Sequence, residues 1–299
     1  MLSLLAATGG PVDPIVWYDL GLSDHLFSIG GFELRYYSLA YLLGVIFAYW
    51  HLSKMIKAPG APLAQRHADD LFFYCTLGVI LGGRIGYSIF YNPDLWSNPV
   101  DVLKLWEGGM SFHGGLMGVL IAIFWVTKRN DLSFLRVCDY IAVNVPMGML
   151  LGRLANFVNG ELWGRQTDVA WGMVFCDGPA RAGVECATTG MVRHPSQLYQ
   201  AGLEGLALLI IMMLMFWKTN ARFRPGLLVG VFTLGMGIAR FVNEFFRQPD
   251  AQLADFAART GLSMGQWLTI PLILIGLIVT IYAVTRKPVG TGQTPQATT

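Results

Sequence analysis

Long runs without a charged residue constrain this chain more than any other feature of its sequence. Residues 36–53, 108–127 and 260–285 contain no Asp, Glu, Lys or Arg. A helix needs roughly 20 mostly apolar residues to cross the hydrocarbon core of a bilayer. Only 13% of the 299 residues are charged and 54% are hydrophobic, whereas soluble domains carry about 25% charged residues. The sequence therefore indicates a polytopic membrane protein.

Four further stretches have the length of a membrane span but carry a few charges. They cover about residues 71–92, 140–160, 197–217 and 225–246. Together with the three uncharged runs they predict an all-α polytopic membrane protein with seven transmembrane helices, four within residues 36–160 and three within residues 197–286.

Basic residues gather on one side of this predicted arrangement. Lys and Arg are enriched in cytoplasmic segments of membrane proteins, and they follow predicted helices one, three, five and seven: Lys54, Lys57, Arg66, Lys128, Arg129, Arg136, Lys218, Arg222, Arg224, Arg286 and Lys287. The same side carries only Asp69, Asp70, Asp131 and Asp139 as acids. We therefore expect an external N-terminal segment (1–35) and a cytoplasmic tail (287–299), whose Pro, Gly, Thr and Gln composition predicts disorder.

One long segment lies between the fourth and fifth predicted helices. Residues 161–196 contain Trp163, Trp171 and several glycines, which predicts a small folded external head. Cys176 and Cys186 of this segment then face an oxidising compartment. A disulfide and two free thiols are both compatible with the sequence.

Seven polar side chains fall within the outer half of the predicted helices: Tyr37, Arg84, His113, Arg153, Glu204, Arg240 and Glu244. A charge at the centre of a membrane helix costs about 2.5–3.5 kcal/mol on insertion scales. Scattered structural polar residues are not expected to collect at one depth. Their common depth predicts a polar site in the outer half of the membrane.

The spacing of these residues predicts an anion site. Arg240, Glu244 and Arg247 follow one helical face at i, i+4 and i+7, so Glu244 can neutralise one or both arginines. Arg153 and Arg240 at one depth repel each other unless carboxylates or an anion lie between them. A phosphate fits this position because a guanidinium group offers it a planar pair of donors.

Glycines recur every four residues in two of the predicted helices. One stripe consists of Gly78, Gly82 and Gly86, and the other of Gly148, Gly152, Asn156 and Gly160. Such stripes usually allow close helix packing and no more.

Several alternatives stay open at this level. Arg84 lies near the outer interface, where a structural role, either extending to lipid headgroups or pairing with Glu204, is as consistent with the sequence as a role in the site. A lone histidine such as His113 is often structural. A transporter or binding protein for an anionic lipid or solute also uses buried arginines. That class predicts polar residues through the inner half or inverted repeats, whereas residues 120–125 and 206–217 are continuously apolar.

Five sequence blocks resemble the bacterial prolipoprotein diacylglyceryl transferase family. In chain order they are GGRIGY (82–87), GGMSFHGG (108–115), GRLANFVNGELWGR (152–165), RHPSQLY (193–199) and EFFRQPD (244–250). The resemblance extends from about residue 36 to residue 267, which is nearly the whole membrane part.

This resemblance implies an enzyme of the bacterial inner membrane. It implies transfer of the diacylglyceryl group of phosphatidylglycerol to the lipobox cysteine thiol of a prolipoprotein signal peptide, forming a thioether and releasing glycerol phosphate. The partners are thus membrane lipid and prolipoproteins; no cofactor, metal or nucleic acid is expected, and a net charge of +2 offers no basic face to a nucleic acid.

The resemblance also implies which residues act. Carried over residue by residue, His113, Arg153 and Arg240 match the family's essential histidine and arginines, and the other matching positions are Tyr37, Arg84, Asn156, Glu161, Gly164, Glu244 and Arg247. Two arginines suit a departing phosphate. A thiol with a pKa of about 8.5 needs a proton acceptor, for which His113 is a candidate; an arginine field that activates the thiol leaves His113 to orient the headgroup instead.

Overall fold

The structure is a computed structural model that describes residues 14–248 and 259–290, apart from residues 24, 31 and 177–187. The chain divides into two compact units. The first contains Met1–Val45, Pro146–Leu209 and Thr233–Leu274, and the second contains Ile46–Val145, Ile210–Phe232 and Ile275–Thr299.

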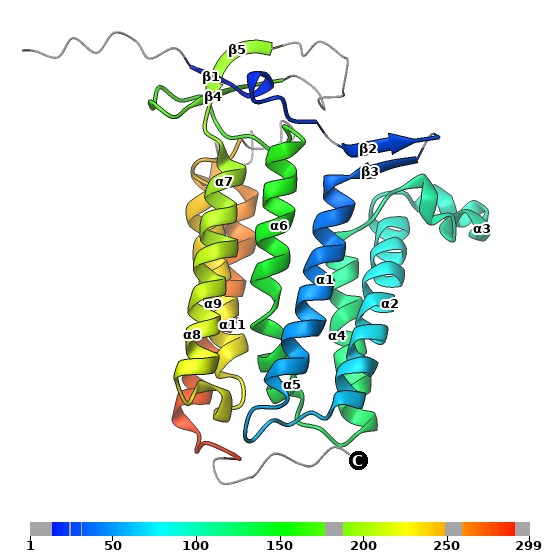
Figure 1. The fold of residues 1–299 in the computed structure, drawn as a ribbon, viewed down its shortest axis with the longest axis vertical. Helices are drawn as coiled ribbons and strands as arrows, with labels where there is room; N and C mark the ends of the chain where they lie inside the picture. Colours follow the sequence, from blue (N-terminus) through cyan, green and yellow to red (C-terminus); the bar gives the residue numbers. More distant parts are fainter. Residues whose placement is uncertain (1–13, 24, 31, 177–187, 249–258, 291–299) are drawn as a thin grey trace, which may run out of the picture. The chain divides into compact units, whose positions relative to one another are not determined.

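All seven predicted helices are helical in the structure (Figure 1). They are α1 (Tyr36–Met55), α2 (Gln65–Phe90), α4 (Phe112–Arg129), the pair α5 (Phe134–Ala142) and α6 (Val145–Val158), the continuous run α7 (Ser196–Gln200), η4 (Ala201–Ala207) and α8 (Leu208–Lys218), then α9 (Leu227–Asn243) and α11 (Met264–Thr285).

Four of these helical segments are long and apolar enough to cross a membrane. They are Gln65–Phe90, Phe134–Val158, Ser196–Lys218 and Met264–Thr285. Large apolar side chains lie open on the helices, for example Ile121 and Ile278, which are 63% and 64% exposed. Side chains of this kind over long helices indicate contact with lipid, and the chain is a helical membrane protein.

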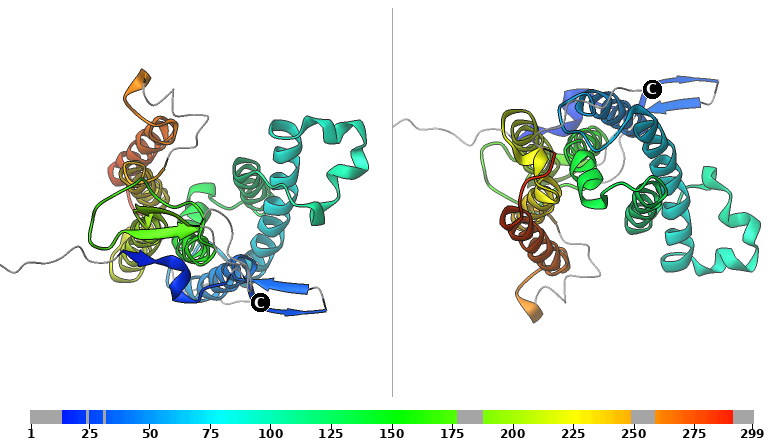
Figure 2. Two further views of the ribbon diagram at one scale, coloured as in Figure 1. Left: turned by 90° about the horizontal axis from the view of Figure 1, so that it is seen from above. Right: turned by 90° about the horizontal axis from the view of Figure 1, so that it is seen from below.

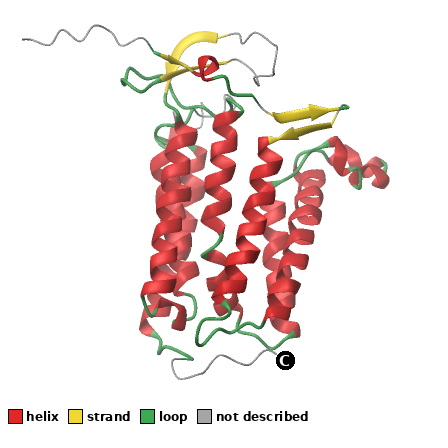
Figure 3. Ribbon diagram, in the orientation of Figure 1, coloured by secondary structure: helices red, strands yellow, loops and turns green. Residues whose placement is uncertain are grey.

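A small β-sheet belongs to the first unit. Its strands are β1 (Ile15–Val16), β4 (Met173–Cys176) and β5 (Thr188–Arg193), in the order β1-β4-β5, with β1 parallel and β5 antiparallel to β4. The strands lie beyond the ends of α6 and α7 (Figure 3). Strands β4 and β5 come from residues 161–196, and β1 of the N-terminal segment completes the sheet, which the sequence did not suggest. We call the sheet of β1, β4 and β5 the head.

Trp17 explains why the N-terminal segment joins this head. It opens the 3-10 helix η1 (Trp17–Leu20) and is fully buried with Met173 and Phe175. Its indole Nε1 donates a hydrogen bond to the Phe157 carbonyl oxygen, 2.8 Å away, at the end of α6. Apolar burial and this hydrogen bond together attach residues 15–20 to the sheet and to α6.

A hairpin of β2 (His25–Ile29) and β3 (Phe32–Arg35) leads directly into α1. Cys176 is buried and disulfide-bonded. Cys186 lies outside the described residues, as do residues 291–299 of the predicted disordered tail.

The second unit is organised around the antiparallel pair α2 and α4, which lie side by side (Figures 1 and 2). A Cβ atom on Gly78 would lie 2.5 Å from the Gly118 carbonyl oxygen, and one on Gly86 would lie 2.7 Å from the Gly114 Cα. The glycine stripe of α2 therefore meets the glycines of α4 backbone to backbone, as the four-residue spacing predicted.

Three short elements connect α2 to α4. They are η2 (Pro93–Ser97), α3 (Pro99–Val102) and η3 (Leu105–Glu107).

Elsewhere in this unit, Tyr140 and Phe216 are fully buried in an apolar core. Asp139 of α5 accepts hydrogen bonds from the backbone amides of Gly226 and Val229, at 2.7 and 2.8 Å, and so caps the start of α9.

Candidate functional site

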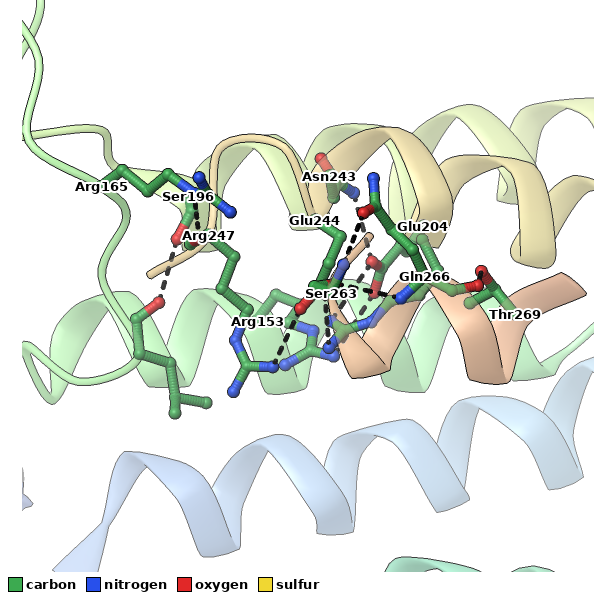
Figure 4. A network of polar contacts seen from close by, with 12 residues as sticks. Arg153, Arg165, Ser196, Glu204, Asn243, Glu244, Arg247, Ser263, Gln266 and Thr269 are labelled. Carbon is green, nitrogen blue, oxygen red and sulfur yellow. Dashed lines mark hydrogen bonds and ion pairs between the residues drawn. The ribbon is translucent and has the colours of Figure 1, made fainter. Parts of the chain in front are cut away.

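A single buried carboxylate lies between two arginines in the first unit. Glu204 is completely buried, and its Oε2 lies 3.4 Å from Nη2 of Arg153. Its Oε1 lies 3.8 Å from Nη1 of Arg240. Figure 4 shows Arg153, Glu204 and Asn243, which come from α6, η4 and α9. The mutual repulsion of two guanidinium groups, which the sequence predicted, is relieved here by one shared glutamate.

The local fold of η4 places Glu204 at this point. Residues Ala201–Ala207 form a π-helix between α7 and α8, a rare geometry that is frequent at functional sites. A Cβ atom on Gly205 would lie 2.6 Å from the Leu150 Cα of α6. Because Leu150 and Arg153 lie one turn apart on α6, this close approach carries the neighbouring Glu204 to Arg153.

The end of α9 supplies the remaining charges of the site. Glu244 Oε2 lies 3.2 Å from Arg240 Nη2, and Glu244 Oε1 lies 3.9 Å from Arg247 Nη1. The prediction that Glu244 pairs with one or both arginines is confirmed for both. Asn243 adds a hydrogen bond from Nδ2 to Glu204 Oε1 at 3.2 Å.

The start of α11 packs against Glu244. Ser263 and Gln266 cap this helix reciprocally: the Ser263 amide donates to Gln266 Oε1 at 2.9 Å, and the Gln266 amide donates to Ser263 Oγ at 3.1 Å. This is a capping box. It brings Gly265 so close that an added Cβ would lie 2.6 Å from the Glu244 carboxyl carbon.

The carboxylates of this cluster are more deeply buried than its arginines. The side chains of Glu204 and Glu244 are 0% and 5% exposed, whereas those of Arg153, Arg240 and Arg247 are 22%, 19% and 19% exposed. Three positive and two negative charges leave one positive charge over. The buried carboxylates thus bind the arginines on their buried side. The exposed part of the guanidinium groups is suited to a monoanion such as a phosphodiester.

The loop after α6 extends the polar network. Arg153 Nη1 donates to Asn156 Oδ1 at 3.4 Å, and Asn156 Nδ2 donates to Glu161 Oε1 at 2.8 Å. The chain turns at Gly160, where φ is +67° and glycine is favoured. Glu161 therefore reaches Arg153 through Asn156, and its carboxylate also accepts a hydrogen bond from Asn159 Nδ2 at 3.2 Å.

Gly164 has a backbone role. Its amide donates to the His194 carbonyl oxygen at 2.8 Å, and it forms a β-bridge with Arg247. An added Cβ would lie 2.6 Å from the carbonyl oxygens of His194 and Phe246. Only glycine fits, and the position holds the loop after α6 against the segment that carries Arg247.

His194 lies next to this contact. Trp171 Nε1 donates to the Tyr199 hydroxyl at 2.7 Å, and this hydroxyl lies 3.1 Å from His194 Nδ1. Partial burial lowers the pKa of His194, and the charge of Asp168 opposes that shift. A neutral imidazole can accept a hydrogen bond from the Tyr199 hydroxyl at Nδ1.

Tyr37, the remaining predicted residue of the first unit, lies in the first turn of α1. It is 38% exposed, and its hydroxyl lies 3.4 Å from that of Tyr41. Its side chain is thus open to a ligand.

Arg84 and His113 belong to the second unit and are described there by themselves. His113 is exposed in the first turn of α4. Arg84 is only 3% exposed, and its guanidinium donates to backbone carbonyls, including Val102 at 2.8 Å and Asp101 at 2.7 Å. The guanidinium of Arg84, one of the positions that match the family, is thus bound to backbone oxygens.

Glu204 is one of the seven polar side chains that the sequence places at this depth, but its pairing with Arg153 and Arg240 was not predicted, because helical periodicity does not reveal a π-helix. Asn243 gave no signal beyond its position three residues after Arg240.

Comparison with known proteins assigns the chain to a family. The family model for prolipoprotein diacylglyceryl transferase matches residues 24–282. A protein of Erythrobacter litoralis named phosphatidylglycerol--prolipoprotein diacylglyceryl transferase is 64% identical over 282 residues, which are 94% of this chain and 96% of the relative. Proteins of the same name from Zymomonas mobilis and Ruegeria pomeroyi are 44% and 45% identical, over 91% and 86% of this chain and 95% and 93% of their own lengths. The chain therefore belongs to the prolipoprotein diacylglyceryl transferase family.

Proposed function

We propose that this chain transfers the diacylglyceryl group of phosphatidylglycerol to the thiol of a lipobox cysteine in a prolipoprotein signal peptide. A bond forms between the cysteine sulfur and the terminal glyceryl carbon, and the bond between that carbon and the phosphate oxygen breaks. Glycerol phosphate leaves with the electron pair, and the thiol gives up its proton. The names of the relatives support both substrates.

The observation that carries this proposal is the pair Arg153 and Arg240 on the shared carboxylate of Glu204. The phosphodiester carries one negative charge, and the departing phosphate monoester gains another as the bond breaks. Arginines that are already held in place by buried carboxylates stabilise this developing charge without reorganising. Glu244 holds Arg240 and Arg247 in the same way.

The remaining predicted residues receive supporting roles in this proposal. Asn156 and Glu161 orient Arg153, Gly164 fixes the loop beside Arg247, and Tyr37 contacts the lipid or the peptide. His113 accepts the thiol proton. The test is the rate of thioether formation by His113→Asn as a function of pH. If this variant keeps the wild-type pH profile and only binds the lipid more weakly, His113 instead orients the headgroup.

We further propose seven membrane spans in the bacterial inner membrane, with the N-terminus and the head outside and the C-terminus in the cytoplasm. The number of long helices and the distribution of Lys and Arg support this topology. The arginine site then lies in the outer half of the membrane, where a signal peptide cysteine and a phosphatidylglycerol headgroup are both within reach.

The test is an assay of the purified chain in nanodiscs that contain phosphatidylglycerol, with a synthetic lipobox peptide. We expect a mass gain of one diacylglyceryl group on the peptide and an equal amount of released glycerol phosphate. A peptide with Ser in place of the cysteine is the control and should gain no mass. Phosphatidylglycerol consumption without thioether formation would contradict the proposal.

Arg153→Lys tests the role of the guanidinium fork. Lysine keeps the charge but loses the two parallel donors, so we expect a loss of activity of about 10²-fold or more. The same change at Arg35, whose ion pair with Glu33 is about half exposed, is the matched control and should leave the rate unchanged. Near-normal turnover of Arg153→Lys would exclude paired phosphate binding by this residue.

A further inference from the structure

Two of the five sequence blocks lie against each other in the second unit. The block 82–87 belongs to α2, and the block 108–115 forms the start of α4. The backbone amide of Ser111 donates to the Gly83 carbonyl oxygen at 2.8 Å. The residues that precede His113 are therefore attached directly to α2.

Arg84 holds the segment that leads to His113. Its Nε donates to the Val102 carbonyl at 2.8 Å and its Nη2 to the Asp101 carbonyl at 2.7 Å. Its Nη1 donates to the carbonyls of Gly108 and, at 3.4 Å, Gly109. One guanidinium group thus joins both ends of residues 101–109, and each of these acceptors is a neutral backbone oxygen.

The two glycines of this segment make the arrangement specific. Gly108 and Gly109 have φ angles of +78° and +79°, which other residues rarely adopt. A Cβ atom on Gly109 would overlap the Tyr87 ring, one turn beyond Arg84 on α2. The chain therefore passes over α2 at one closely fitted point.

The backbone on both sides of His113 is fixed by contacts. Ser111 is the N-cap of α4, and its Oγ accepts the Gly114 amide at 3.2 Å. Gly114 in turn lies against Gly86 of α2. His113 occupies the turn between these two anchors, and its side chain is exposed.

We infer that Arg84 is a positioning residue for His113: it binds the backbone of residues 101–109 and thereby sets where the first turn of α4 presents the imidazole. The inference rests on the proposed function, in which His113 acts on the thiol or on the headgroup. In this role Arg84 does not touch either substrate.

The experiment compares Arg84→Ala with His113→Asn in the full-length chain in nanodiscs. Both are assayed with phosphatidylglycerol and the lipobox peptide, as kcat and KM across pH. We expect Arg84→Ala to change the same parameter that His113→Asn changes, whether this is kcat with its pH profile or KM for phosphatidylglycerol, with a loss of about 10²-fold. Hydrogen exchange measures the attachment directly, and Arg84→Ala should speed exchange of residues 101–115.

Ser88→Ala is the matched control. Ser88 is completely buried in the same helix, but its hydroxyl donates to the Ile85 carbonyl of α2 itself. We expect normal exchange in residues 101–115 and wild-type kinetics. If Arg84→Ala does not fold, Gly109→Ala disturbs the same segment from the other side and should give the same signature.

Four outcomes overturn the inference. They are unchanged exchange in Arg84→Ala, faster exchange with wild-type kinetics, a change in a parameter that His113→Asn leaves intact, and wild-type kinetics for His113→Asn itself. A wild-type chain without any transfer activity would instead refute the proposed function, and the exchange measurement would still decide whether Arg84 holds the segment.

Discussion

The two arginines of the site owe their placement to one residue. Glu204 contributes one oxygen to Arg153 and the other to Arg240, and Asn243 fixes its orientation. A fully buried carboxylate persists only when its charge is compensated. Removing that charge would leave three arginines with Glu244 as the remaining buried acid of the cluster.

Glu204→Gln should therefore weaken both folding and activity. Breaking a buried ion pair by removing one partner typically costs about 3–5 kcal/mol. The freed arginines would also move apart, and we expect the transfer rate to fall by about 10²-fold. Thermal unfolding in nanodiscs and the peptide assay measure the two effects.

Glu33→Gln is the control for this substitution. Glu33 pairs with Arg35 at 3.0 Å, but both side chains are about half exposed, and such pairs contribute at most about 1 kcal/mol. Equal effects of the two substitutions would show that Glu204 does not hold the arginines.

At this scale the sequence predicted the charged residues better than their partners. The spacing of Arg240, Glu244 and Arg247 was enough to predict their pairing, because i, i+3 and i+4 neighbours are set by the helix itself. The pairing of Glu204 with Arg153 joins two helices. It depends on packing that no local pattern encodes.

At the scale of the elements, the π-helix η4 is the feature that builds the site. Its two glycines differ in surroundings: Gly205 packs against the Leu150 backbone of α6, whereas a Cβ on Gly202 would meet no atom within 4 Å. The same substitution at these two positions therefore separates helix propensity from helix contact.

Gly205→Ala should push η4 away from α6 and separate Glu204 from Arg153. We expect lower thermal stability and a clear loss of transfer activity. Gly202→Ala should keep full activity and gain up to about 1 kcal/mol, because alanine is the better helix former. A Gly205→Ala variant that behaves like Gly202→Ala would show that the close approach is not needed.

Element prediction succeeded where hydrophobic runs are long and failed where geometry departs from them. The seven segments predicted as long helices are helical in the described residues, since each run greatly exceeds the length of a soluble strand. The break between α5 and α6 and the π-helix were not, because neither changes the apolar pattern. The head sheet was missed in part because β1 has only two residues. It is held in place by the neighbouring Trp17, whose contacts are with residues that are distant in the sequence.

At the scale of the whole molecule, the open question is how many helices cross the membrane. Four segments meet both the length and the hydropathy expected of a span, while α1, α4 and α9 contain more polar residues or are shorter. The proposed seven spans place the termini on opposite sides, whereas an even number would place them on the same side.

Single cysteines near the two ends of the described chain distinguish these topologies. Asp19 and Lys287 are both exposed, and a membrane-impermeant maleimide applied to spheroplasts should label Asp19→Cys and leave Lys287→Cys unlabelled. Both variants should react fully in detergent, and the parent chain gives the background of the native thiols. Labelling of both from outside would mean that one of α1, α4 and α9 does not cross. The reverse pattern would place the head and the loop that carries Glu161 in the cytoplasm. A translocated signal peptide does not present its cysteine on that side, so this result would contradict the proposed location of the site.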